Sequence, residues 1–559
     1  MLAAIPPEEA KRGDSQLWGF WLPLILLQLS IAGFWWWSVR VNNGQLVYAL
    51  DDAYIHMAIA KNVVQHHIWG VTPYGFTSCS SSTLWVILLS AIYFCCGVNV
   101  GAPFVLNLMS ASLLLLAAWR FLRSHGMQDK WIFVVQVGVI YLTPLPFLIF
   151  DGMEHSLHAL VTILAVSCAS RLLERPKDSA GKFNRVAMIA FMLLLSALRY
   201  EGVFLAMAVT LLLLIRRRVW DALATGAAAV APGLLVGGWA TLHGWPLLPT
   251  TIVLKTSLVS MATPYGWIRH FYQIARINLH QGQHLVALIL PSLSFYIASL
   301  NKGRGIWSRL NVASAVFILT ALAHLTCAGL DAGYRYEAYL LALGIVVVAA
   351  QTMDFMPDLL ARPLTRQAVT AVRVAVAMLG GLLFLPLVTH GAIALCRLEL
   401  ATHNIYEQQY QMARFIHKYY EGSSVALNDI GAVNYFAEIR CLDLYGLGSL
   451  SVAKAKMGSR FDSTTINQLA REANTRIAII YQSWFVDFDS GMNQIPPQWV
   501  LVGTWTIPHN VIAGDDTVSI FAVDPTEAPR LTKSLKEFSS QLPADVVQGG
   551  AYTESSSKI

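Results

Sequence analysis

The feature that most constrains this chain is a series of apolar segments that fill its first 390 residues or so. Each segment is about 18–22 residues long, which is enough for a helix to cross a hydrocarbon core of about 30 Å. Backbone polar groups find no water in lipid, so such segments must be helical. The sequence therefore predicts a polytopic α-helical membrane protein with about 11 transmembrane helices.

The charge distribution supports this class and gives an orientation. Only 13% of the 559 residues are charged, whereas roughly 25% is usual in a soluble domain. The net charge of +6 is spread over short loops, which argues against a nucleic-acid partner. Alternate loops carry the basic residues, and the positive-inside rule makes these loops cytoplasmic. They are Lys11 and Arg12; Arg120, Arg123 and Lys130; Arg171, Arg175 and Lys182; Arg216, Arg217 and Arg218; Lys302, Arg304 and Arg309; and Arg362, Arg366 and Arg373.

Three regions follow from the composition. We expect a membrane domain over residues 1–390, whose first outer loop covers about 40–82, and an extracytoplasmic α/β domain over 391–530. In that domain "SVALND", "IRCLDL", "TRIAIIY", "WVLVGTWTI" and "VSIFAVD" are typical of strands, and residues 405–420 of a helix. Residues 531–559 are expected to form a polar, flexible tail. The short apolar stretch "STLWVILLSAIYFCCG" is expected to lie in the membrane interface rather than cross it.

Acidic and basic side chains gather in the loops that the topology places outside. Because they stand at the ends of spans, they should meet at one membrane face. Acids beside bases there suit group transfer from a lipid-linked phosphate, in which a carboxylate deprotonates the acceptor and a cation stabilises the leaving phosphate. Transport is the alternative, although it usually places charges along the spans. The stretches concerned are "ALDDAYIHMAIAKN", "DGMEHSLH", "RYEG", "PTTIVLK" and "DAGYRYEAY".

These stretches resemble a known superfamily. "DDAYIHMAIAKNVVQHHIWGVTPYGFTSCSSSTLW" resembles the first outer loop of the GT-C polytopic membrane glycosyltransferases, most closely the bacterial arabinofuranosyltransferase-like branch. "DGMEHSL", "RYEG", "PTTIVLK" and "YRYEAY" are similar in the same order, as is "LNDIGAVNYFAEIRCLDLYGLGS" in the second domain. The similarity covers about residues 15–525. Two departures leave the sugar and the acceptor open, because Tyr200 and the Cys79–Ser82 stretch stand where prolines are common.

The resemblance implies an inverting hexosyl- or pentosyltransferase of the inner membrane. It transfers a sugar from a polyprenyl-phosphate-linked donor to an extracytoplasmic glycan, lipid or protein of the cell envelope. The base is a first-loop acid, Asp51 or Asp52, and Asp51 is slightly preferred. No cofactor is required. The residues expected to bind the donor phosphate are Lys255, Arg335 and Arg199, and those expected to bind substrate are Asp151, Glu154, Glu201, Tyr54 and Tyr336.

Structural roles are open for several of these residues. One of the two first-loop acids can cap the helix that follows, and Lys255 can be an interface lysine that reaches toward water. Arg335 can pair with Glu337 or Asp331, and Arg199 can pair with Glu201. His155 and His158 lack a third ligand at fixed spacing, so no metal is assigned, although a divalent metal stays an open alternative.

Two other functions remain open for the whole chain. A lipid-linked glycan transporter or a non-catalytic scaffold would tolerate Asp51→Asn and Asp52→Asn. A phosphotransferase would need a nucleophile or a metal-diphosphate site, and the sequence contains no clear motif for either.

Overall fold

A computed structural model describes residues 17–176, 181–255, 266–330, 335–360, 366–458, 460–486 and 491–553. Within these ranges, eight helices are long and apolar enough to cross a membrane, and three shorter apolar helices accompany them. The predicted class, a polytopic helical membrane protein with a C-terminal sheet domain, is confirmed, whereas the count of about 11 spans stays a prediction. The bundle helices are α1 (Trp18–Val41), α4 (Ala102–Ser124), α5 (Asp129–Leu142), α7 (His155–Glu174), α8 (Lys182–Leu198), α9 (Gly202–Ile215), α10 (Val219–Leu242), α13 (Gln283–Asn301), α14 (Arg309–Cys327), α15 (Ala338–Leu360) and α16 (Arg366–Ile405).

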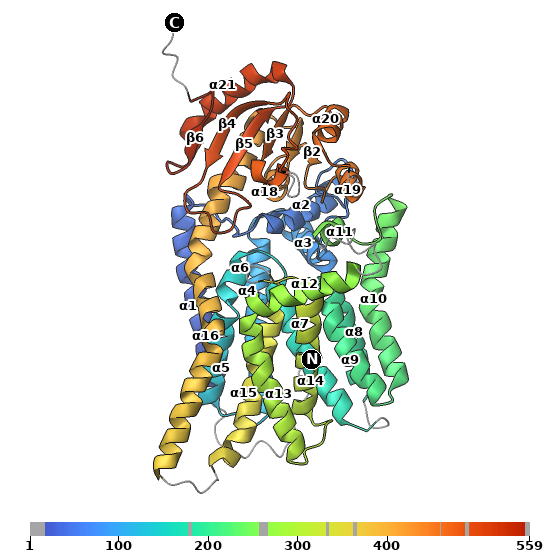
Figure 1. The fold of residues 1–559 in the computed structure, drawn as a ribbon, viewed down its shortest axis with the longest axis vertical. Helices are drawn as coiled ribbons and strands as arrows, with labels where there is room; N and C mark the ends of the chain where they lie inside the picture. The colour runs from blue at the N-terminus through green and yellow to red at the C-terminus, as the bar shows by residue number, and fades with distance from the viewer. Residues whose placement is uncertain are drawn as a thin grey trace.

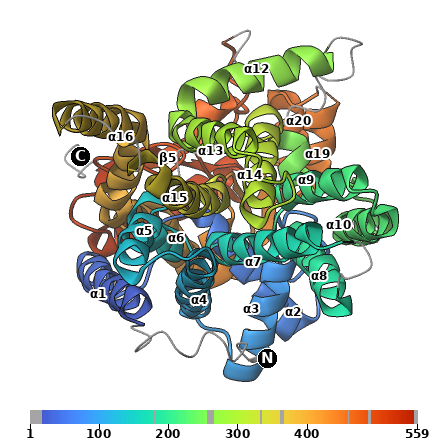
Figure 2. The same cartoon turned by 90° about the horizontal axis from the view of Figure 1, so that it is seen from below.

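Helix α7 lies in the middle of the bundle, and α4, α8, α14 and α15 pack around it (Figure 2). Most of its residues are buried, including Ser156, His158 and Thr162. A polar side chain on an inner helix avoids lipid, and such positions are usually functional or hydrogen-bonded. The turn before α7 is therefore held firmly by the packed helix that follows it.

The apolar segment over residues 131–150, which hydropathy predicts to be one of the spans, is divided in the structure. Helix α5 ends at Leu142, and the short helix α6 (Leu145–Phe150) follows after a two-residue break. Pro144 and Pro146 lack the backbone N–H that a continuous helix needs, which accounts for the break. All six residues of α6 are buried, so the turn after it begins inside the bundle rather than at its surface.

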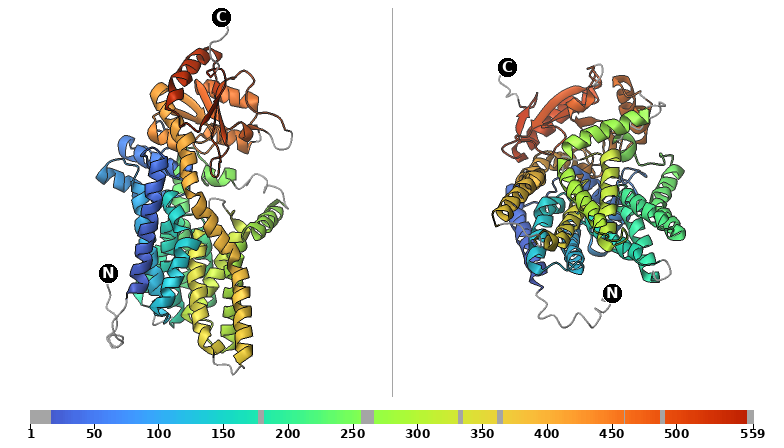
Figure 3. Two further views of the ribbon diagram at one scale, coloured as in Figure 1. Left: turned by 90° about the vertical axis from the view of Figure 1, so that its left-hand side faces the viewer. Right: turned by 60° about the horizontal axis from the view of Figure 1, so that its bottom comes forward.

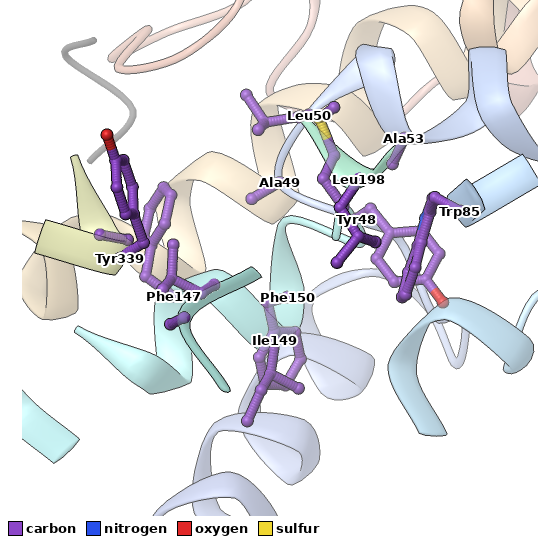
Figure 4. Close-up of a cluster of buried hydrophobic side chains, with 14 of the residues drawn as sticks. Tyr48, Ala49, Leu50, Ala53, Trp85, Phe147, Ile149, Phe150, Leu198 and Tyr339 are labelled. Carbon is purple, nitrogen blue, oxygen red and sulfur yellow. The ribbon is translucent and has the colours of Figure 1, made fainter. Parts of the chain in front are cut away.

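The first outer loop forms helix α2 (Asp51–His66), and α3 (Thr83–Cys96) follows the loop; both helices lie between the bundle and the sheet domain (Figure 1). At 14 residues, α3 is about 21 Å long, which is shorter than a hydrocarbon core, and its interfacial position stays a prediction. The segment before α2 packs against α6 in the apolar cluster of Figure 4, where Tyr48 and Ala49 meet Phe150. The backbone N–H of Ala49 donates to the Phe150 carbonyl oxygen at 2.8 Å. This core fixes where α2 begins.

The C-terminal domain holds one six-stranded sheet in the order β2-β1-β3-β5-β4-β6. The β1 strand is parallel to β2 and β3, and the other pairs are antiparallel. Helix α16 runs along the bundle and continues through η4 (Tyr406–Tyr410) and α17 (Gln411–Tyr419) into this domain (Figure 3). The five expected strands, which are β1 to β5, and the expected helix are confirmed, and β6 is an additional strand. The strands are β1 (Ser424–Leu427), β2 (Arg440–Asp443), β3 (Ile477–Ile480), β4 (Val500–Thr506), β5 (Thr517–Ala522) and β6 (Val547–Gly549).

The prediction of a flexible tail from residue 531 is wrong for the part that the structure describes. Helix α21 (Ala528–Phe538) buries Leu531, Leu535 and Phe538 in the apolar core of the domain. The β6 strand then pairs with β4. Apolar residues at positions i, i+4 and i+7 of a short polar helix account for the docking. Residues 554–559 lie outside the described residues.

Candidate active site

A cavity of about 490 Å³ lies where the first-loop helix α2 meets the bundle and the sheet domain. Its walls come from α2, the turns before α7 and α9, α11 (Thr250–Lys255), the segment before α15 and the sheet domain. The apolar wall consists of Ile55, Val203, Phe204, Ile252, Ala328 and Leu447, among others. Its polar residues include Asp52, His56, Ser81, Arg199, Glu201, Arg335 and Tyr336. A mostly apolar pocket with a few convergent polar groups is the usual form of a ligand site.

Asp52 and Arg335 form an ion pair in this cavity. The Arg335 Nη2 lies 2.9 Å from Asp52 Oδ2, and 32% of the Asp52 side chain is exposed. Arg335 Nη1 also contacts the Met153 sulfur at 3.2 Å. The pair therefore places a solvent-accessible carboxylate beside a guanidinium in the cavity, although the two residues are 283 positions apart in the sequence.

Asp51 is turned away from the cavity. Its Oδ2 accepts the backbone N–H of Gly431 at 2.7 Å, and its Oδ1 accepts that of Ala432 at 2.8 Å. Burial and the charge of Asp429 raise the pKa of Asp51, while the two backbone donors lower it. Consecutive helical residues point about 100° apart, which explains why neighbours have different surroundings. Asp51 thus joins α2 to the start of α18 (Gly431–Phe436), and Asp52 is the first-loop acid that lines the cavity.

Arg199 is held by two carboxylates. Its Nε and Nη2 donate to the two oxygens of Glu201 at 3.1 and 2.8 Å, and its Nη1 donates to Glu154 at 2.8 Å. Burial alone would raise the pKa of Glu201, but the charge and hydrogen bonds of Arg199 lower it to about 2. The alternative in which Arg199 pairs with Glu201 is thus present in the structure, and Glu154 is a second partner of Arg199.

Tyr336 links this ion cluster to the Asp52 pair. Its ring lies 5.0 Å from the Arg199 guanidinium carbon and 5.2 Å from that of Arg335. An aromatic face attracts cations at such separations. Tyr336 therefore fixes both arginines, and it lines the cavity as expected of a substrate-binding residue.

Three other predicted site residues occupy different places. Asp151 is buried, its Oδ1 accepts the Met153 backbone N–H at 2.7 Å, and burial raises its pKa. The hydroxyl of buried Tyr54 accepts the Tyr48 backbone N–H at 3.1 Å. Neither is among the cavity-lining residues described. Lys255 ends α11, but its side chain lies outside the described part of the structure, as does Asp331.

His56 and Ser81 also line the cavity, and neither is among the predicted site residues. His56 is one turn after Asp52 on α2, and Ser80 Oγ lies 3.2 Å from its Nδ1. Burial lowers the pKa of His56, while the charge of Glu154 opposes this shift. The i, i+4 spacing from Asp52 is the signal that could have placed His56 on the same helix face.

One family model matches part of the chain, and two solved structures are similar to most of it. The family model of a domain of unknown function (DUF8728) matches residues 403–521, which lie in the sheet domain and the helix that enters it. No curated protein matches. Among solved structures, the chain is similar to ArnT from Cupriavidus metallidurans bound to undecaprenyl phosphate, at 12% identity over 90% of this chain and 98% of that one, with a TM-score of 0.49. The chain is also similar to ArnT from the same organism in the apo state, at 12% identity over 92% of this chain and 99% of that one, with a TM-score of 0.49.

Proposed function

We propose that this integral membrane protein is a GT-C-type glycosyltransferase. It transfers a sugar from a polyprenyl-phosphate-linked donor to an extracytoplasmic acceptor and inverts the anomeric carbon. The observation that carries the proposal is the Asp52–Arg335 pair at 2.9 Å in the cavity. The first-loop and "YRYEAY" motifs that resemble the superfamily supply one member each of this pair.

The pair suits a reaction that needs a base and a phosphate-binding cation together. The donor phosphate binds Arg335, which releases Asp52 from its ion pair. Asp52 then accepts the proton of the acceptor hydroxyl, whose oxygen attacks the anomeric carbon from the face opposite the phosphate. The bond between that carbon and the phosphate oxygen breaks, and Arg335 stabilises the charge on the leaving polyprenyl phosphate. A single displacement inverts the carbon and needs no enzyme nucleophile.

The surroundings of the pair support separate roles for its neighbours. Arg199 already satisfies two carboxylates, so we assign it to positioning Tyr336 and Arg335 rather than to the phosphate. Val203 and Phe204 of α9 give the cavity an apolar side that suits the prenyl chain. Leu447 of the sheet domain lines the cavity as well, which favours an acceptor that contacts this domain.

The charge pattern supports an extracytoplasmic cavity. Arg304 and Arg309, which belong to one of the basic loops, line a different pocket together with Ser124, Glu174 and Asp354. The positive-inside rule makes this loop cytoplasmic. The sheet domain lies at the opposite end of the bundle, beside α2 (Figure 1).

The test is sugar transfer by the purified full-length protein. A panel of polyprenyl-phosphate sugars is incubated with envelope extract as the acceptor source, and donor consumption and product are followed. We expect one donor to turn over and Asp52→Asn to lower kcat by about 10²–10⁴, the usual contribution of a general base. Asp51→Asn is the matched control, and it should keep its activity per folded molecule.

Two outcomes would count against the proposal. If Asp52→Asn turns the donor over like the wild type, Asp52 is not the base. If no donor is consumed but labelled donor lipid crosses the bilayer of proteoliposomes, the transporter alternative replaces the enzyme.

A further inference from the structure

A cluster of two histidines and a glutamate lies apart from the polar residues of the proposed reaction. His284 lies at the start of α13, Glu337 directly precedes α15, and His390 lies within α16. Helix α13 packs against both α15 and α16, so the bundle brings the three side chains together (Figure 2). The His284 and His390 side chains are 8% exposed and that of Glu337 is 1% exposed.

The distances within this cluster match a tetrahedral metal site. Glu337 Oε1 lies 3.3 Å from His284 Nε2 and 3.4 Å from His390 Nε2. Zinc bonds to nitrogen and oxygen are about 2.0–2.1 Å long, so two tetrahedral ligand atoms stand about 3.3 Å apart. The observed contacts are longer than the usual range of about 2.7–3.2 Å for an N–H···O hydrogen bond. One ligand atom from each residue lies within 4.8 Å of the other two.

The charges and polar atoms of the cluster also favour a cation. Oε2 of Glu337 is buried and has no hydrogen-bond partner among the described residues. The two imidazole rings stack beside this carboxylate at 4.1 Å with an interplanar angle of 23°. A cation held between the three side chains would give the buried carboxylate a partner. Two histidines and one glutamate are also a ligand set that zinc uses in proteins.

A second cavity gives access to the cluster. It has a volume of about 570 Å³, and His280, Gln283 and Thr389 line it together with the three cluster residues. A cavity of this size, with polar side chains beside the cluster, can admit a hydrated ion and supply water as a fourth ligand.

We propose that His284, Glu337 and His390 bind one divalent transition metal, for which zinc is the best match, with water from the cavity as its fourth ligand. The metal joins α13, α15 and α16 at the end of the bundle that carries Arg335, two residues before Glu337. The inference does not depend on the proposed sugar transfer.

The test is metal binding by the full-length protein, purified without a histidine tag. After chelator treatment, the protein is incubated with Zn²⁺, separated from free ion by gel filtration and analysed for metal. We expect about one zinc per chain, and its loss in His284→Ala and in Glu337→Gln. His280→Ala, which lines the same cavity, and His403→Ala, from a more exposed His403–Glu407–Asp545 cluster, are matched controls that should keep the zinc.

A second readout uses the wild type alone, in case the variants fold poorly. Co²⁺ in place of zinc should give the strong visible absorption of a tetrahedral site, and excess Zn²⁺ should abolish it. Zinc should also raise the unfolding temperature of the wild type, because only the folded bundle assembles the ligands. The proposal is overturned if the wild type retains no zinc, or if His284→Ala and Glu337→Gln retain as much as the controls while remaining monodisperse. Sugar transfer is not measured, so a failure here leaves the proposed function untouched.

Discussion

At the scale of single residues, the proposed mechanism makes Arg335 the cation that the donor phosphate must take from Asp52. Replacing it with glutamine removes the charge that stabilises the leaving group, so kcat should fall by about 10²–10³ and KM for the donor should rise. Arg335→Lys keeps the charge but loses the planar fork that binds phosphate in two places, so its loss should be smaller. Steady-state kinetics against donor concentration measure both effects. Equal kinetics for Arg335→Gln and the wild type would remove Arg335 from the phosphate site.

Arg199 should behave differently, because its charge is paired with the buried carboxylates of Glu154 and Glu201. Arg199→Gln leaves Glu154 and Glu201 buried without their partner, and breaking a buried pair costs about 3–5 kcal/mol of the free energy of unfolding. Thermal or denaturant unfolding in detergent measures the loss. The triple variant Arg199→Gln, Glu154→Gln, Glu201→Gln removes the uncompensated charges and should recover part of the stability. A stable Arg199→Gln with a raised KM would instead make Arg199 a direct phosphate ligand.

The first-loop acids show how far a sequence can resolve a site. The pattern places two adjacent acids at a helix start beside a membrane, and the structure has both there. Which of them faces the cavity depends on contacts with Gly431 and Ala432, about 380 positions away, and no local pattern encodes such a contact. The sequence preference for Asp51 therefore had no physical basis in the helix itself. By contrast, the alternative that pairs Arg199 with Glu201 was visible because the two residues are neighbours.

At the scale of elements, the sequence predicts best what is repeated and apolar. The strands β1 to β5 and the long bundle helices follow from runs of apolar residues whose length and spacing fix their type. The division of the 131–150 segment was missed because hydropathy alone does not register Pro144 and Pro146. Helix α21 was missed for another reason, since its polar composition hides three apolar residues on one face. The His284–Glu337–His390 cluster cannot be predicted from the sequence, because its members come from three distant segments of the chain.

The junction of α2 with α18 should be sensitive to a single methyl group. A Cβ on Gly431 would overlap the Asp51 carbonyl oxygen and lie 2.8 Å from Asp51 Cγ and Oδ2. Gly431→Ala should therefore push α18 away from α2 and cost about 1–3 kcal/mol, the usual range for overpacking. Unfolding in detergent measures the loss of stability, and hydrogen exchange of the 431–436 amides measures the weakened contact of α18.

Gly75→Ala is the matched control for this junction. It lies in the same first loop, and a Cβ added there would meet no other atom within 4 Å, so the substitution should change little. Equal stability and equal exchange in the two variants would show that the α2–α18 contact does not hold the sheet domain in place.

At the scale of the whole molecule, function depends on which side of the membrane the sheet domain occupies. The cavity, α2 and the sheet domain lie at one end of the bundle, and the basic loops lie at the other (Figure 1). A polyprenyl-phosphate sugar and an envelope acceptor can meet at Asp52 only if that first end faces outward. The positive-inside rule predicts this orientation, because positive loops are retained in the cytoplasm during insertion.

Single cysteines in a variant that lacks the seven native ones test the orientation. Lys533→Cys lies on α21 of the sheet domain, where the native side chain is 80% exposed, and Asn301→Cys lies at the opposite end, where α13 ends. A membrane-impermeant maleimide should label Lys533→Cys in cells whose cytoplasmic membrane is intact, and Asn301→Cys only after that membrane is permeabilised. The reverse pattern would place Asp52 and Arg335 in the cytoplasm, where the site would meet a nucleotide-activated donor instead of an outward-facing lipid-linked one. Labelling of each variant after permeabilisation shows that the variant is present, so poor expression cannot imitate either result.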